Sequence, residues 1–181
     1  FDVLDYALFS APGAPVRQAL IDAGIGDDVS GSFESGVKQP VFSVMAKNAN
    51  ASDKERFEQI IRKTLEKLVT DGINKDALLA GINSAEFRFR EADFGQFPKG
   101  LLYGLTCMDS WLFDDRKPFI HLECLVTFAF LKEQVKTNYF EELVKKYLLD
   151  NTHGSMVMIV PKRNKNTEEE NALKEKLAQY K

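Results

Sequence analysis

The sequence contains few of the side chains that catalyse reactions or bind metals. Its 181 residues include two histidines, two cysteines and one tryptophan. His121 and His153 form no His-x-x-x-His pair, and neither a His-Glu-x-x-His nor a His-x-x-Glu-His segment is present. A catalytic zinc ion usually takes three protein ligands, so we expect no metal site in this chain. We interpret His121 as a helix-start contact and His153 as part of a turn.

Motifs for nucleophilic catalysis and phosphate binding are also missing. The segment Ser30-Gly-Ser-Phe-Glu-Ser-Gly places serines between glycines, but its spacing does not match a Gly-x-Ser-x-Gly elbow. Gly24-Ile-Gly26 has no third glycine and no following Gly-Lys-Ser/Thr. We therefore assign no catalytic residue, and the sequence does not identify substrate-binding residues.

The two cysteines, Cys107 and Cys124, lie among apolar residues in segments that we expect to be helical. This setting favours two reduced, buried thiols in an intracellular protein. A disulfide is the alternative, and the spacing gives it no support.

Charge and hydropathy exclude two classes of partner. The formal net charge is -3, without the basic surface typical of a nucleic-acid-binding protein. The most apolar stretch, Leu122 to Leu131, is interrupted by Glu123 and Thr127, whereas a membrane span needs about 20 apolar residues. We expect neither a nucleic-acid partner nor a membrane partner. No signal peptide is recognisable, and because the chain starts at Phe1 without a methionine we expect it to be part of a longer protein.

Periodicity predicts helices and short strands in the first third of the chain. Leu4, Ala7 and Leu8 share one face of a helix over 2–10, and a second helix over 16–23 ends at Gly24. We expect strands at 32–34 and 41–47, and in the second strand Phe42, Val44 and Ala46 share one face.

The middle of the chain reads as mainly helical. Ser52 and Glu55 form the pattern of a capping box, followed by a helix that ends at Gly72. Asn74 is the expected start of the next helix, which continues to about Asp93. We expect a helix after Pro98, and further helices over 125–135 and 140–149. The expected core face of the helix after Pro98 consists of Leu101, Leu105, Met108 and Leu112, with Trp111 adjacent.

The order of elements predicts an α+β fold with an antiparallel sheet and helices packed on one face. We expect the last strand at Ser155–Val160, ended by Pro161. Residues 1–161 are then one domain, and residues 162–181 are a linker followed by the start of a helical hairpin. Thr167 and Glu170 form the pattern of a second capping box, and the helix they open carries a thin apolar stripe of Leu173, Leu177 and Tyr180.

The densest charged patch lies in Ala85-Glu-Phe-Arg-Phe-Arg-Glu-Ala-Asp. Glu86 and Arg90 are four residues apart, so they can pair along one helical face, with Arg88 and Glu91 beside them. A solvated or partly buried ion-pair surface is one interpretation. A wall that contacts a peptide or a neighbouring domain is the other, and the residues leave both open.

Several segments in order resemble the presequence-protease branch of the pitrilysin/insulinase superfamily. They span nearly the whole chain and depart from the family's pattern at Ala14, Val16, Ile25 and Lys99. The matching segments are Val3-Leu-Asp-Tyr-Ala-Leu, Ala14-Pro-Val-Arg-Gln-Ala-Leu, Asp22-Ala-Gly-Ile-Gly, Asn83-Ser-Ala-Glu-Phe-Arg-Phe-Arg-Glu, Phe97-Pro-Lys-Gly-Leu, Trp111-Leu-Phe and Tyr147-Leu-Leu-Asp-Asn-Thr-His.

The resemblance implies a position within a larger enzyme. In that family two similar halves, joined by a helical hairpin, close around a chamber, and each half holds two α+β domains. This chain matches the second, non-catalytic domain of the first half and the opening of the hairpin. The zinc motif belongs to the first domain, so the resemblance places zinc in the parent protein and no cofactor in this fragment.

The expected function is therefore a chamber-forming domain of a zinc-dependent oligopeptidase that degrades unstructured peptides. Its expected partners are the neighbouring domains of the same chain and the parent's peptide substrate. We also expect the fragment by itself to self-associate. The expected compartment is the bacterial cytoplasm or the interior of a mitochondrion or plastid. The alternatives are a domain of a catalytically inactive scaffold or subunit of the same superfamily, and an unrelated peptide- or protein-binding module.

Overall fold

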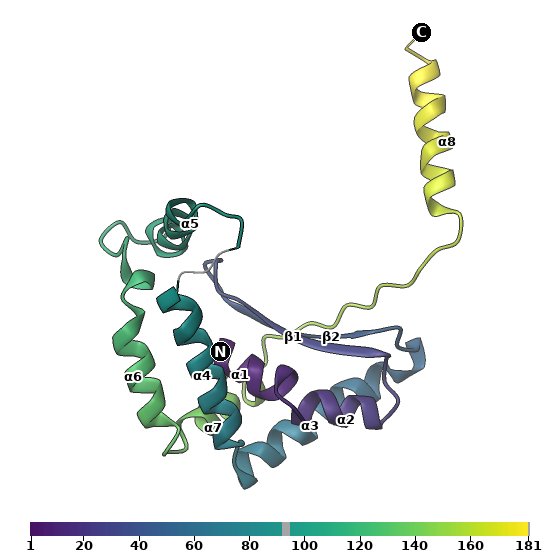
Figure 1. The fold of residues 1–181 in the computed structure, drawn as a ribbon. Helices are drawn as coiled ribbons and strands as arrows, with labels where there is room; N and C mark the ends of the chain where they lie inside the picture. The colour runs from purple at the N-terminus through teal and green to yellow at the C-terminus, as the bar shows by residue number, and fades with distance from the viewer. Residues whose placement is uncertain (92–94, 181) are drawn as a thin grey trace.

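The computed structural model describes residues 1–91 and 95–180, and it confirms an α+β fold in which helices dominate and the sheet is small (Figure 1). One antiparallel sheet is found in the described chain, and its two strands are β1 (Asp28–Glu34) and β2 (Val41–Lys47). The main helical body lies on one side of this hairpin, and the C-terminal helix α8 (Lys165–Ala178) stands away from that body.

The N-terminal helices form the centre of the core. The chain begins with α1 (Asp2–Asp5), which continues into the π-helix η1 (Tyr6–Ser10). Leu4, Ala7 and Leu8 are buried, so the predicted apolar face is confirmed. The next helix, α2 (Pro15–Asp22), buries Val16 and Leu20. Gly24 follows it with φ +69, a left-handed conformation that ends helices and that glycine adopts at low cost.

The hairpin lies over these helices with one face toward the core. Phe42, Val44 and Ala46 pack against the buried cluster, while Val41 and Met45 are exposed, as the alternation predicts. β1 starts at Asp28, four residues before the predicted start. Gly31 lies where β1 crosses the N-terminal helices, and a Cβ atom there would collide with the Asp5 carboxylate and the Phe9 ring. Glycine thus allows the hairpin to approach the helices closely.

Two long helices, α3 (Lys54–Asp71) and α4 (Lys75–Glu91), complete the core. The predicted capping box is wrong: Ser52 lies in the 3-10 turn η2 (Ala51–Asp53), and the helix starts with Asp53 at its N-cap, without a capping side-chain hydrogen bond. The predicted start at Asn74 is confirmed, since its side-chain oxygen accepts hydrogen bonds from the Asp76 and Ala77 backbone N–H groups at 2.9 and 3.1 Å. The predicted end near Asp93 lies outside the described residues.

The second half of the chain is helical up to residue 149. The elements are α5 (Lys99–Trp111), the 3-10 turn η3 (Ile120–Leu122), α6 (Cys124–Gln134), α7 (Tyr139–Val144) and the π-helix η4 (Lys145–Leu149). These positions confirm the predicted helices over 125–135 and 140–149. Phe140 and Val144 of α7 are buried in the main cluster.

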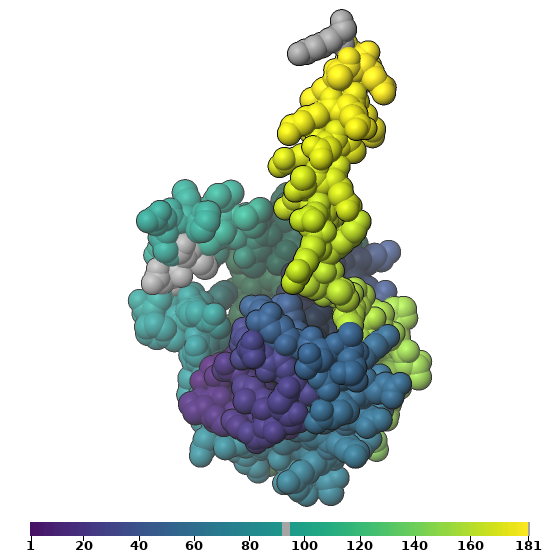
Figure 2. Space-filling view, turned by 90° about the vertical axis from the view of Figure 1, so that its right-hand side faces the viewer, coloured from purple at the N-terminus to yellow at the C-terminus, as the bar shows by residue number. Residues whose placement is uncertain are grey.

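Two predictions for the C-terminal part are wrong. Residues Ser155–Val160 are extended but have no strand partner in the described chain, because β1 and β2 pair only with each other. The second capping box is also absent, since α8 begins at Lys165 after Asn164 in the left-handed conformation, which places Thr167 inside the helix. Figures 1 and 2 show α8 as an arm rising from the body, so its thin apolar stripe is exposed.

Candidate functional site

Helix α5 turns its apolar stripe outward. Leu101, Leu105, Met108 and Leu112 lie on one helical face, and their exposed fractions range from 39% to 66%. The prediction that this stripe is a core face is wrong for this chain. A stripe with helical spacing is buried only when a neighbouring element covers it, and the main neighbour of α5 in the described chain is the short turn η3.

The opposite side of α5 faces the rest of the chain. Cys107 is buried there, and Thr106 and Ser110 are partly buried. A Cβ atom added to Gly100 or Gly104 of the same helix would meet nothing within 4 Å, so open space surrounds both glycines. The side of α5 that carries Leu101, Leu105 and Met108 is therefore the less covered one.

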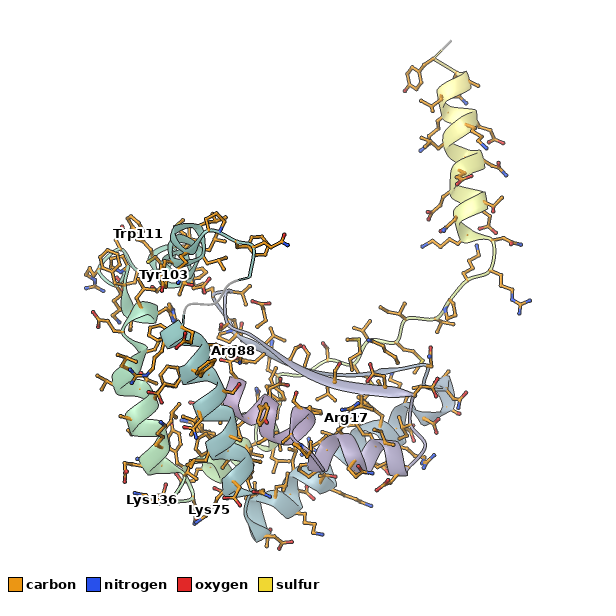
Figure 3. The ribbon with its side chains drawn as sticks, viewed as in Figure 1. Arg17, Lys75, Arg88, Tyr103, Trp111 and Lys136 are labelled. Atoms are coloured by element: carbon orange, nitrogen blue, oxygen red, sulfur yellow. The ribbon has the colours of Figure 1, made fainter. Side chains whose placement is uncertain are left out.

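Aromatic side chains extend this surface beyond the end of α5. Trp111 and Phe113 are each about half exposed, and Figure 3 shows Trp111 on the outer side of the molecule. We define the apolar face as Leu101, Leu105, Met108, Trp111, Leu112 and Phe113. Large contiguous apolar patches on protein surfaces mark interaction sites. The geometry of α5 is thus that of an interface rather than of a reaction centre.

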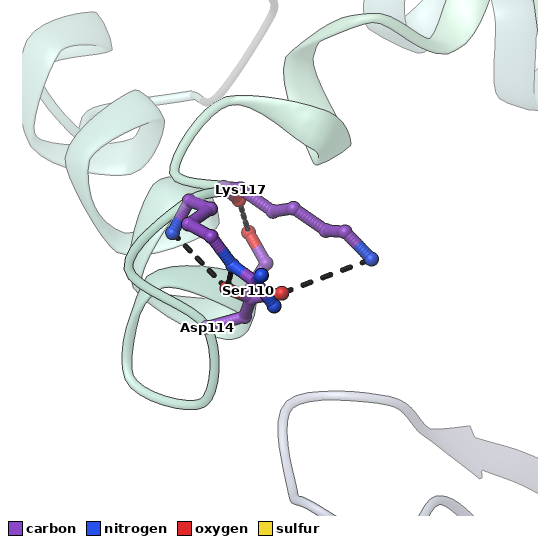
Figure 4. Close-up of polar contacts among 4 residues, drawn as sticks. Ser110, Asp114 and Lys117 are labelled. Carbon is purple, nitrogen blue, oxygen red and sulfur yellow. Dashed lines mark hydrogen bonds and ion pairs between the residues drawn. The ribbon is translucent and has the colours of Figure 1, made fainter.

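A polar turn holds the end of α5 in place (Figure 4). The Ser110 hydroxyl donates to the Lys117 backbone carbonyl at 2.7 Å, and the Asp114 carboxylate accepts from the Arg116 backbone N–H and side-chain Nε, each at 3.1 Å. The side-chain hydrogen bond from Arg116 is the largest of the effects that lower the pKa of Asp114 below its ordinary value. These contacts stabilise the turn after α5 and help to position Trp111 and Phe113 next to it.

The charged patch on α4 is an ion-pair network that reaches α6. Glu86 pairs with Arg90, as predicted, through Nε at 2.8 Å and Nη2 at 2.6 Å, and its other oxygen accepts from Lys132 of α6 at 2.5 Å. The hydrogen bond from Lys132, followed by that from Arg90, lowers the pKa of Glu86. The sequence did not predict Lys132 as a partner of Glu86. The two residues are 46 positions apart, and local spacing reveals only contacts between near neighbours. Arg88 has no ion pair with a described residue, and Figure 3 shows its place on the upper part of α4.

In the described part of the chain, the two histidines and the two cysteines do not belong to a group of side chains that could bind a metal ion. The His121 carbonyl accepts a hydrogen bond from the Cys124 thiol at the start of α6, and the His153 backbone N–H donates to Asn151 in a turn. Cys107 is buried and Cys124 half-buried, and both are free; burial raises the pKa of the Cys124 thiol. Within the described chain, no group of three or more His, Cys, Asp and Glu side chains is placed to hold a metal ion.

Comparisons with known proteins agree with the family resemblance at a coarse level. No protein-family model matches the chain. The chain is 44% identical over all its 181 residues to Protein HypA of Clostridium perfringens. It is 31% identical over 172 residues, 92% of the chain, to Presequence protease 1, chloroplastic/mitochondrial, of Arabidopsis thaliana, and 24% identical over 184 aligned residues, 98% of the chain, to Presequence protease, mitochondrial, of Xenopus laevis.

The chain spans less than a fifth of the length of these relatives: 18%, 16% and 17% respectively. The similarity to proteins named presequence protease supports a pitrilysin/insulinase-type family at a coarse level. Within residues 1–91 and 95–180, none of the helices combines the length and hydrophobicity of a transmembrane segment.

Proposed function

We propose that this chain is a non-catalytic, chamber-forming domain of a longer zinc-dependent peptidase that degrades unstructured peptides. The observation that carries the proposal is the outward apolar stripe of α5. Burying such side chains contributes about 1.5–3 kcal/mol each. A helix that leaves four of them in solvent is therefore suited to contact another part of a larger protein. The relatives are more than five times longer than the aligned region, which provides such a part.

In this proposal the domain encloses part of the chamber and does not take part in catalysis. A bound zinc ion would supply an activated water molecule for peptide hydrolysis, and three protein side chains normally hold it. The described residues do not fit such a site, so we place the zinc in another domain of the parent protein. The apolar face would pack on that neighbouring domain, and the charged network of α4 and α6 would lie near the chamber wall.

We further propose the division of the chain at residue 161. Residues 1–161 would form the enclosing domain, and residues 162–181 would be the linker and the first helix of the hairpin that joins the two halves. The free position of α8 supports this division, because a connecting helix needs its partner helix for packing. Two of the three relatives named above carry mitochondrial or chloroplastic in their names, and for this protein we propose the interior of an organelle or the bacterial cytoplasm.

Metal analysis and peptide cleavage by the full-length protein test the proposal. We expect one zinc ion per full-length chain and cleavage of unfolded peptides but not of folded proteins. We expect the 181-residue chain to bind no stoichiometric zinc. Full-length protein without zinc and without cleavage would support an inactive scaffold of the same superfamily instead. Stoichiometric zinc in the 181-residue chain would contradict the placement of the domain.

An interface variant tests the role of the apolar face. In the full-length protein, Leu101→Lys with Leu105→Lys should weaken packing between domains and raise susceptibility to limited proteolysis, with reduced peptide cleavage. Ile21→Lys on α2 is the control, because Ile21 is a large apolar side chain that is 39% exposed and lies outside the apolar face. Equal proteolysis of both variants and the unmodified protein would show that α5 is not an interface.

A further inference from the structure

Strand β2 has a free edge. The Lys47 carbonyl accepts a hydrogen bond from the Asp27 backbone N–H, so the backbone groups of Lys47 are directed toward β1. Alternate residues of an antiparallel strand direct these groups to opposite sides. Phe42, Val44 and Ala46 therefore turn their N–H and C=O groups away from β1. In the described chain no third strand pairs with this edge.

An apolar hollow lies between β2 and the elements η1, α3 and η4. Its volume is about 160 Å³, and the residues that line it all have apolar side chains: Leu8, Phe9, Phe42, Val44, Ile61, Leu65 and Leu148. An enclosed apolar cavity of about 150 Å³ holds a benzene-sized group, and this open hollow has a similar volume. The hollow is therefore large enough for one apolar side chain that approaches along the edge of β2.

The extended segment Ser155–Val160, which we call the strap, has the pattern of a strand with one face turned to the body. Val157 and Ile159 are 80% and 91% exposed, whereas Met158 is 41% exposed and Met156 is partly buried. This alternation has the period of two that side chains follow along a strand. In Figures 1 and 2 the strap leaves the body beside the hairpin, and in Figure 1 it runs in the same direction as β2.

A short tether links the strap to the hollow. Leu148 of η4 lines the hollow, and residues 150–154 join the end of η4 at Leu149 to Ser155. Five residues reach at most about 18 Å, so the strap cannot move far from the edge of β2. A short flexible link gives an effective concentration in the millimolar range, which favours the strap over a segment from another molecule.

We propose that the strap closes on the outer edge of β2 as a parallel third strand, with the Met158 side chain over the hollow. Closure gives partners to the backbone groups of Phe42, Val44 and Ala46 and covers the apolar lining. A two-stranded sheet is marginal alone, and a third strand stabilises it. Because only residues 161–164 separate the strap from α8, closure also fixes the base of this arm. The strap thus couples the sheet to the direction in which α8 leaves the body.

Amide hydrogen exchange, resolved by residue, tests the closed strap in the 181-residue chain. We compare the unmodified protein with Met158→Asp, which places a charge over the hollow, and with the matched control Ile159→Asp, which places it on the exposed side of the strap. We expect the amides of Phe42, Val44 and Ala46 to exchange at least about tenfold more slowly in the unmodified protein and in the control than in Met158→Asp.

Two results would overturn the proposal. One is unprotected amides at Phe42, Val44 and Ala46 in the unmodified protein, and this readout needs no variant to fold. The other is protection that rises with protein concentration, which would identify a second copy as the occupant of the edge. Neither result bears on zinc or peptide cleavage in the full-length protein, so the proposed function and the closed strap are tested separately.

Discussion

At the residue scale, the buried carboxylate of Glu141 ties α7 to the connection between α3 and α4. Its Oε1 accepts a hydrogen bond from the Ile73 backbone N–H at 2.8 Å, and the residue is 7% exposed. Gly72 beside it has φ +93, a conformation that ends α3 and directs the Ile73 N–H toward the carboxylate. A single side chain thus holds the turn between the two longest helices of the described chain.

Replacing Glu141 by alanine should lower the free energy of unfolding by about 1–3 kcal/mol, because the Ile73 N–H loses its buried acceptor. Glu141→Gln keeps an acceptor oxygen and should lose less. Glu142→Ala, at the next and exposed position, should change the free energy by less than about 0.5 kcal/mol. Urea denaturation measures all three. Equal losses for Glu141→Ala and Glu142→Ala would show that the contact does not stabilise the fold.

The pH dependence of stability should reveal the network around Glu86. Because hydrogen bonds from Lys132 and Arg90 lower its pKa in the folded state, its contribution is present above the ordinary pKa of 4.5 and is lost as the pH falls through the lowered value. The difference in unfolding midpoint between the unmodified chain and Glu86→Gln should therefore shrink below about pH 4.5. Glu91→Gln on the same helix is the control, since Glu91 forms no ion pair with a described residue. A difference independent of pH would contradict the network.

At the scale of elements, α5 is helical because of its sequence but is positioned by its surroundings. Its apolar residues have helical spacing, yet the core of this chain is completed by the N-terminal helices, α3, α4 and α7. The helix therefore packs through its other side, around the buried Cys107. Gly100 and Gly104 lie in its first half without neighbours, which makes α5 a helix of low intrinsic stability.

Substituting Gly104 by alanine should raise the free energy of unfolding by about 0.5–1 kcal/mol, because alanine costs less backbone entropy and meets no neighbour in this chain. Gly31→Ala should lower the free energy of unfolding by about 1–3 kcal/mol, because a Cβ there collides with Asp5 and Phe9. Thermal and urea unfolding of both variants would measure the contrast. A destabilising Gly104→Ala would mean that α5 is packed against another surface.

At the scale of the whole molecule, α5 and α8 are among the helices that the described chain leaves partly or wholly uncovered. The apolar face of α5 and the stripe of Leu173, Leu177 and Tyr180 on α8 both face solvent. The relatives continue far beyond the aligned region, so in a longer protein these surfaces have material to pack against. Alone, the chain exposes them to other copies of itself.

We expect the 181-residue chain to self-associate as its concentration rises, because association removes these apolar surfaces from water. Light scattering over a range of concentrations measures the average mass. Leu101→Lys with Leu105→Lys should shift association to higher concentration, and Ile21→Lys should leave it unchanged. A clean monomer at high concentration in the unmodified chain would contradict this prediction.

The sequence by itself predicted most of the helices, the strand β2 and the resemblance to presequence proteases. Helical spacing located Leu4, Ala7 and Leu8 in the core, alternation located the inward face of β2, and Asn74 marked the start of α4. These features depend on neighbours within a few residues, and local spacing records them. The ordered similarity to presequence proteases extends over nearly the whole chain.

Only the tertiary structure decided which apolar surfaces are covered. The leucines of α5 and the residues Ser155–Val160 have the patterns of buried elements, yet burial and strand pairing need a partner from elsewhere in the chain. The ion pair from Glu86 to Lys132 and the bond from Glu141 to Ile73 likewise join positions 46 and 68 residues apart. Spacing along a sequence indicates which side of an element is apolar, and the packing of distant elements decides what that side contacts.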